Sequence, residues 1–215
     1  CAALDLTLSP GDLETAAALE RFSRESGWCP SVQIKVNTGM NRYGYRWDAV
    51  DRWAPTLQSM SAFRFAGIYS HFAMSDEADK SFAHEQRRRF GEVLDALTSR
   101  GFPVGLRHLC NTGGLLDLPE AHLDMVRLGI LPLGVHPSKV CRRLAGLKPI
   151  MTVKALVTSL QTLETGETVG YGLKYRAASR RRVAILPLGY AVEGAVFAFR
   201  SHFWHHTMHR KRPGL

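Results

Sequence analysis

One stretch of the chain combines two cations with a turn: residues 35–42, Lys-Val-Asn-Thr-Gly-Met-Asn-Arg. A short apolar run over residues 32–36 leads into it, and Thr38-Gly39 marks the turn. A strand that ends in a turn carrying a cation commonly forms an anion or cofactor site at the carboxyl edge of a parallel sheet. Taken alone the stretch is weak, because a Lys in a strand and an Arg in a loop are more often surface residues.

Three later segments repeat this transition from an apolar run to polar residues. The run over 65–72 ends near Ser70-His71, the run over 107–110 leads into Asn111-Thr112-Gly113-Gly114, and the run over 125–130 contains Arg127. Helices are expected between them, over 49–60 and 81–99, from apolar residues at helical spacing. Alternating strands and helices predict a parallel α/β sheet or barrel.

Punctuating residues predict where the elements begin and end. Residues 4–8 alternate as a strand would, and Ser9, followed by Pro10, fits the cap and first position of a helix. Gly27 is expected to end this first helix, and Gly101 the helix over 81–99.

The pattern changes near residues 138–149, after which helical spacing disappears. Strands are expected over 151–160, 167–172 and 182–190, with a turn at Thr165-Gly166. We therefore predict a partial barrel over residues 1–144 and the start of an all-β domain over 145–191. Residues 192–215 contain four of the nine histidines and little apolar alternation. We interpret them as an atypical, frameshifted or truncated tail and not as a metal site.

Composition argues against several classes of protein. The formal charge is +9, but the arginine clusters lie among acidic residues, at a strand start or in the tail, without a nucleic-acid-binding signature. The four cysteines are scattered, which is typical of reduced, cytoplasmic thiols. No apolar run approaches the roughly 20 residues that span a bilayer. We expect a cytoplasmic protein that binds neither nucleic acid nor membrane.

Taken in order, the strand ends resemble the alanine racemase family of pyridoxal-phosphate enzymes. Seven stretches carry the resemblance: residues 35–42, 70–73, 108–112, 124–130, 147–149, 166–172 and 189–191. The resemblance implies a (β/α)8 barrel followed by a β domain, here present in part. It also implies an isomerase that interconverts L- and D-alanine and supplies D-alanine for the cell wall.

The resemblance assigns catalytic roles to three residues. Tyr171, within Gly-Tyr-Gly, matches the tyrosine that moves the α-proton of the substrate. A phenol is a poor base at neutral pH, so its surroundings must assist it. His71 and Arg127 match the residues that provide those surroundings, and His108 matches the next member of the same network.

The remaining matches concern the cofactor, pyridoxal 5'-phosphate. Arg127 also matches the arginine that faces the pyridine nitrogen, and Arg42 an arginine near the phenolic oxygen and the substrate carboxylate. Lys35 matches a lysine that is carbamylated in many family members, which would turn a cation into an anion beside Arg42. Phosphate-binding loops match at four residues: Asn111, Thr112, Gly129 and Ile130. The position of Thr112 is usually Ser, and that of Asn37 usually Asp.

The family's Schiff-base lysine has no counterpart in this chain, and we expect the chain to begin part-way through the barrel. Whole family members are dimers in which each active site takes residues from both chains. We therefore expect this chain alone to be inactive, and the full-length protein to be a homodimer acting on alanine. Three alternatives remain: a non-catalytic remnant or binding module, a racemase for serine or a broader substrate range, and an amino acid decarboxylase.

Overall fold

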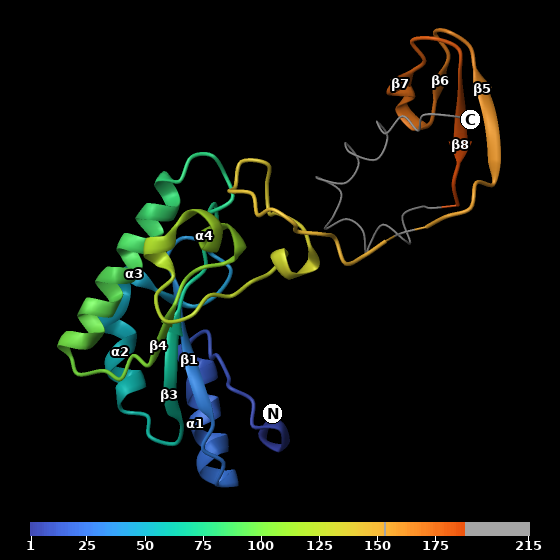
Figure 1. Cartoon of the computed structure of the whole chain (residues 1–215). Coiled ribbons are helices and arrows are strands. Elements are labelled where there is room, and N and C mark those ends of the chain that lie inside the picture. The colour runs from blue at the N-terminus through green and yellow to red at the C-terminus, as the bar shows by residue number, and fades with distance from the viewer. Residues whose placement is uncertain (153, 188–215) are drawn as a thin grey trace. The chain divides into compact units, whose positions relative to one another are not determined.

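The structure is a computed structural model that describes residues 1–152 and 154–187 (Figure 1). The chain divides into two compact units, residues 1–150 and residues from 151 onward. The tail predicted over 192–215 lies outside the described residues, as do positions 188–190 of the last predicted strand.

The first unit contains a parallel sheet of four strands in the order β2-β1-β3-β4. They are β1 (Ser31–Asn37), β2 (Tyr45–Arg46), β3 (Arg64–Tyr69) and β4 (Leu106–His108). All three pairings are parallel, as the alternation of strands and helices predicted. The carboxyl ends of β1, β3 and β4 therefore lie at one edge of the sheet.

Three helices build the hydrophobic core with one face of this sheet: α1 (Leu13–Ser26), α2 (Val50–Gln58) and α3 (Ser81–Ser99). Their apolar sides meet Ile34, Val36 and Ile68 of the strands. In Figure 1, α2 and α3 lie along the same side of the strands. The shorter elements are α4 (Thr112–Asp117), η1 (Ala2–Leu4), η2 (Trp47–Ala49), η3 (Pro119–Ala121) and η4 (Leu131–Leu133).

The helix ends agree with the predicted glycines but not with the predicted cap. Gly27 ends α1 in the left-handed region, at φ 70°, and Gly101 follows α3 at φ 66°, as glycine allows. The cap of α1 is Asp12, whose side chain accepts from the Thr15 N–H at 2.7 Å. The prediction of Ser9 was wrong, because its hydroxyl bonds the Tyr69 hydroxyl instead, at 2.9 Å.

Two predicted strands are reduced to single bridges. In the run over 4–8, Asp5 adopts φ 46°, which ends extended backbone, and only Leu8 pairs, with Val32. In the run over 125–130, only Met125 pairs, with His108. The pairing stops there because the neighbouring chain leaves β4 after His108 and turns into α4.

The second unit contains β-strands, as predicted, but they differ from the predicted ranges. Among the described residues of 151–160 only 159 and 160 lie in a strand, and the range 167–172 has strand at Thr168–Val169 and then enters a 3-10 helix. β5 (Ser159–Leu163) pairs antiparallel with β8 (Arg181–Ile185), and β6 (Thr168–Val169) pairs antiparallel with β7 (Tyr175–Arg176). Gly166 takes φ 90° in the predicted turn. The single-turn helix η5 (Tyr171–Leu173) connects β6 to β7. Within the described part of the chain, no helix has the length and apolarity required to cross a membrane.

Candidate functional site

Three side chains of the candidate site form one row across the sheet. Lys35 of β1 is opposite Tyr69 of β3, and Tyr69 is opposite His108 of β4. Neighbours in parallel strands point to the same face, and successive residues alternate. Because Ile34 and Ile68 face the helices, the row Lys35–Tyr69–His108 faces the other side of the sheet.

A cavity of about 390 Å³ lies over this row. Three cations line it, together with two histidines and several hydroxyl-bearing side chains. The lining residues are Thr7, Leu8, Ser9, Gln33, Lys35, Arg42, Tyr43, Tyr69, His71, His108 and Arg127. None of these carries a carboxylate, so the cavity has the donor set of an anion-binding site.

Arg127 connects the strand ends around the cavity. Its guanidinium donates to the Ser70 carbonyl at 2.6 Å and to Nδ1 of His71 at 3.3 Å. It also donates to Nδ1 of His108 at 2.5 Å and lies 5.1 Å from the centroid of the Tyr69 ring. All of these acceptors are uncharged, so the positive charge of Arg127 is not neutralised by them.

The two histidines are held in their neutral form. His108 is 1% exposed and stacks on Tyr69, with ring centroids 5.0 Å apart. Its Nδ1 accepts from Arg127, so its Nε2–H donates to Oε1 of Gln33 at 2.8 Å. Burial and the charge of Arg127 lower the pKa of His108 to about 4. The same two causes, with Arg42 and Lys35, lower the pKa of His71 to about 4.

Lys35 is a buried cation in a cation-rich site. It is 2% exposed, and its Nζ lies 4.5 Å from the centroid of the Tyr43 ring and 5.6 Å from that of Tyr69. Burial, Arg42 and Arg127 lower its pKa to about 8. No carboxylate among the described residues forms an ion pair with it. Aromatic faces therefore stabilise a charge that its neighbours oppose.

Arg42 lies in the loop after β1, and hydrogen bonds between polar residues of that loop fix its conformation. The side chain of Asn37 accepts from the N–H groups of Gly39 and Asn41, both at 3.1 Å. Its amide group donates to the side chain of Asn41 at 3.0 Å, and Asn41 takes φ 57°. An aspartate at this position could accept the same two backbone bonds but could not donate the third.

The predicted phosphate-binding residues form a second group near α4. Asn111 caps α4 by accepting from the Gly114 N–H at 3.1 Å. The buried hydroxyl of Thr112 accepts from the Gly129 N–H at 3.0 Å. Ile130 follows directly and precedes η4. Two segments 17 residues apart are thereby brought together, but these residues do not line the cavity over the row.

Tyr171, the predicted catalytic tyrosine, belongs to the second unit. It begins η5 between two glycines with positive φ, Gly170 at 82° and Gly172 at 71°. Its side chain is fully exposed. The structure thus presents the phenol on the surface of its own unit, and the cavity residues named above all belong to the first unit.

Sequence reasoning did not identify several of the cavity residues. Tyr69, Tyr43 and Gln33 contact the predicted residues directly. Two of them could have been found from strand alternation, because Gln33 precedes Lys35 by two residues and Tyr69 precedes His71 by two. Tyr43 lies in a loop and carries no such periodic signal.

Comparison with known families agrees with the motifs in both halves of the chain. The sequence model "Alanine racemase, N-terminal domain" matches residues 1–137, and "Alanine racemase, C-terminal domain" matches residues 150–211.

Relatives extend the match across most of the chain. Alanine racemase 2 of Caldanaerobacter subterraneus subsp. tengcongensis is 34% identical over 188 residues, which is 87% of this chain and 48% of the relative. The alanine racemase of Carboxydothermus hydrogenoformans is 40% identical over 159 residues, 74% of this chain and 43% of the relative. The chain spans about half the length of the relatives it matches.

Solved structures give the same result for the fold. The alanine racemase of Streptomyces coelicolor A3(2) matches with a TM-score of 0.74 and 31% identity, over 88% of this chain and 51% of that one. The biosynthetic alanine racemase of Pseudomonas aeruginosa matches with a TM-score of 0.69 and 30% identity, over the same shares. Fold, strand-end motifs and both domain matches agree, and the chain belongs to the alanine racemase family.

Proposed function

We propose that the protein to which this chain belongs interconverts L- and D-alanine with pyridoxal 5'-phosphate. The observation that carries the proposal is the cavity over the row Lys35–Tyr69–His108, where cations and neutral histidines converge without a carboxylate among the lining residues. Such a cavity suits a ligand with several anionic groups. The racemic product would supply D-alanine for peptidoglycan.

The residues present fit the proposed cofactor. Its phenolic oxygen is an anionic group that Arg42 could bind, and Arg127 offers a guanidinium whose hydrogen-bond partners are all neutral. Thr112 offers a hydroxyl that can donate its own proton to a phosphate while it accepts from the Gly129 N–H. When bound, pyridoxal phosphate supplies an electron sink that makes the α C–H of an amino acid acidic.

Arg127 would determine how strong that sink is. A guanidinium keeps its proton under all ordinary conditions, so it cannot give one to a pyridine nitrogen that it faces. Burial lowers the pKa of Arg127, but from a value so high that the group stays charged. An unprotonated ring withdraws electrons less strongly, which limits side reactions of the substrate.

The proton on one face of the substrate would be moved by Tyr171. A phenolate there needs a hydrogen-bond donor or a nearby cation. His71 suits this task, because its Nδ1 accepts from Arg127 and its neutral ring therefore carries the proton on Nε2. Arg42 would hold the substrate carboxylate. In family dimers each site takes residues from both chains, so we propose that the full-length protein is a homodimer.

A graft into a whole relative tests the function without requiring the present chain to act alone. Residues 1–187 would replace the aligned part of the Streptomyces coelicolor alanine racemase, which this chain matches in fold. We expect the graft to form D-alanine from L-alanine in an assay coupled to D-amino acid oxidase. The Arg127→Ala graft should lose at least about 100-fold in kcat/KM, since it removes a charge from the reacting centre.

The Arg107→Ala graft and the 215-residue chain alone serve as controls for the activity assay. Arg107→Ala removes another arginine of the same region, one paired on the surface with Asp124 at 2.8 Å, and should leave kcat/KM within about 3-fold. A folded graft that binds pyridoxal phosphate but racemises neither alanine nor serine would contradict the proposal. The 215-residue chain alone is expected to be inactive in the same assay.

A further inference from the structure

Gln86 lies in the second turn of α3 and connects two loops that carry site residues. Its side chain is completely buried. The amide oxygen accepts from the Ala73 N–H at 2.8 Å, and the amide nitrogen donates to the His71 carbonyl at 3.0 Å. The same nitrogen donates to Oγ1 of Thr38 at 3.1 Å. One side chain therefore satisfies both its donors and its acceptor with residues of the loops after β1 and β3.

The bond to Thr38 continues as a chain of buried hydroxyl groups. The Ser70 hydroxyl donates to the Val36 carbonyl at 2.7 Å. Its single proton is thereby used, so in the 2.7 Å contact between Thr38 and Ser70 the Thr38 hydroxyl must be the donor. Thr38 then accepts from Gln86. The chain runs in one direction, and Thr38 and Ser70 are at most 1% exposed.

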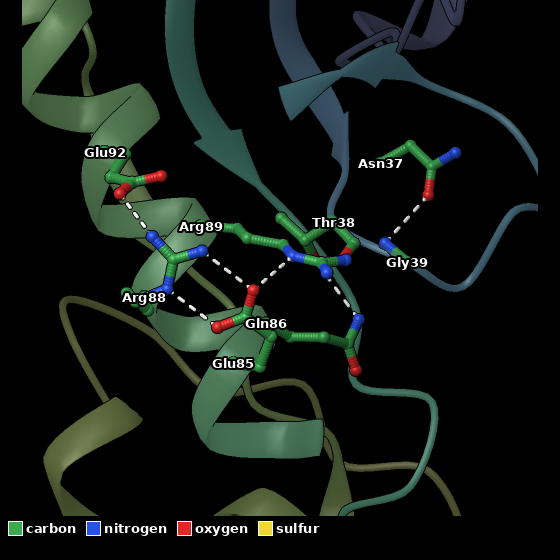
Figure 2. Close-up of polar contacts among 8 residues, drawn as sticks. All are labelled: Asn37, Thr38, Gly39, Glu85, Gln86, Arg88, Arg89 and Glu92. Carbon is green, nitrogen blue, oxygen red and sulfur yellow. Dashed lines mark hydrogen bonds and ion pairs between the residues drawn. The ribbon is translucent and has the colours of Figure 1, made fainter. Parts of the chain in front are cut away.

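The neighbouring turn of α3 holds the same loop from outside. Arg89 donates to the Thr38 carbonyl at 3.0 Å and is held by Glu85 at 2.8 Å (Figure 2). Figure 2 shows Gln86 and Arg89 on the side of α3 that faces Thr38. A Cβ at Gly39 would lie 2.7 Å from the Phe82 ring, so the loop packs closely on the helix.

We propose that Gln86 is a positioning residue, which sets the distance between the loop carrying Arg42 and the loop carrying His71. It does not line the cavity, so it would act only through Thr38, His71 and Ala73. A buried amide whose hydrogen bonds are all formed is costly to replace. Each lost bond leaves a buried donor or acceptor with neither a protein partner nor water to bond. Only the effect on racemisation rests on the proposed function; the effect on His71 does not.

The pKa of His71 depends on where its imidazole lies in the folded chain. Arg127, Arg42 and Lys35 are the charged groups that lower its pKa, together with burial. Gln86→Met keeps the volume of the side chain and removes all three bonds. In the 215-residue protein, we expect NMR titration to show the pKa of His71 rising by about 1 pH unit or more, as the ring leaves these cations. His108 is held by Gln33 and Arg127, and its pKa should change by less than about 0.3.

Substitutions at Thr38 test the same connection with less risk to the fold. Thr38→Val removes the hydroxyl and should shift the pKa of His71 in the same direction, whereas Thr38→Ser keeps the hydroxyl and should restore the native value. Gln58→Met is the matched control, because Gln58 makes one bond at the surface, to the Arg100 carbonyl at 3.2 Å. It should leave His71 unchanged.

The titration decides between a positioning and a merely structural role. If folded Gln86→Met and Thr38→Val proteins both keep the native pKa of His71 within about 0.2, Gln86 only fills the core and the proposal is wrong. If Gln86→Met does not fold, the Thr38 pair alone decides. In the grafted racemase, Gln86→Met should lower kcat/KM by about 10-fold or more. A folded graft that binds pyridoxal phosphate but is inactive would contradict the proposed function and leave the titration result standing.

Discussion

Lys35 shows how single residues of this site oppose one another. Its ammonium is buried beside two guanidiniums, and its nearest favourable partners are the faces of Tyr43 and Tyr69. Carbamylation would change this balance, because it replaces the cation by an anion that attracts Arg42. The reaction requires the neutral amine. Lowering the pKa from 10.5 to about 8 makes that form abundant near pH 8.

Labelled bicarbonate tests the carbamylation of Lys35. With ¹³C-bicarbonate at pH 8 to 9, we expect a carbamate signal in the ¹³C NMR spectrum of the native protein. The signal should grow as pH rises through the pKa of Lys35, about 8. Lys35→Arg should abolish it, since a guanidinium stays charged.

Lys80→Arg is the control, because Lys80 pairs with Asp117 at 2.9 Å. It should leave the carbamate signal in place. A native spectrum without the signal at pH 9 would show that Lys35 remains a free amine. A signal of unchanged size in Lys35→Arg would show that the carbamate forms on another amine.

At the scale of elements, the start of helix α1 determines which residue caps the helix and which contributes to the cavity. Helix α1 begins where Asp12 caps it, and the cap frees Ser9 to bond Tyr69 at the cavity. Two residues that both suit a cap therefore have different roles, one in the helix and one in the site. Their substitutions should be distinguishable.

Asp12→Ala should lower the free energy of unfolding, because it removes the bond to the Thr15 N–H. Asp12→Asn, which keeps the acceptor, should recover most of this loss. Ser9→Ala should cost less, since its bond to Tyr69 is exposed. Urea denaturation measures all three. Equal losses for Ser9→Ala and Asp12→Ala would argue that Ser9 contributes to the cap after all.

The sequence was sufficient to predict the strand ends but not their mutual contacts. Alternating apolar runs predicted the parallel sheet, and the order of motifs indicated the family. The hydrogen bonds of Gln86 were invisible, because a glutamine within an amphipathic helix looks like any surface residue. The shortened strand beyond Met125 was missed for a related reason: strand length depends on how far the partner chain stays alongside.

On the scale of the first unit, the buried histidines make stability depend on pH. His108 is neutral in the fold with a pKa of about 4, below the value near 6.5 of an unfolded histidine. The unfolded chain therefore takes up the proton first as pH falls. The contribution of the neutral His108 to the free energy of unfolding should be present above about pH 6.5. It should be lost as the pH falls from 6.5 to 4.

For His108, 1% exposed, this amounts to about 2 kcal/mol between pH 6.5 and 5. Thermal denaturation across this range would measure it. His108→Gln removes the titrating ring. It should reduce the number of protons taken up on unfolding by about one, and so make the free energy of unfolding depend less steeply on pH. An unchanged slope in the variant would assign the effect to other groups.

One extra residue in β3 determines which side chains share the row. β1 pairs Val32 with Phe65 and then Gln33 with Gly67, so Ala66 is unmatched. Phe65 and Ile68 both pack on the helix side, although a regular strand would point residues three apart to opposite faces. The bulge thus changes the parity of the strand. An alanine that lines no part of the cavity decides that Tyr69, and not Ile68, stands beside Lys35.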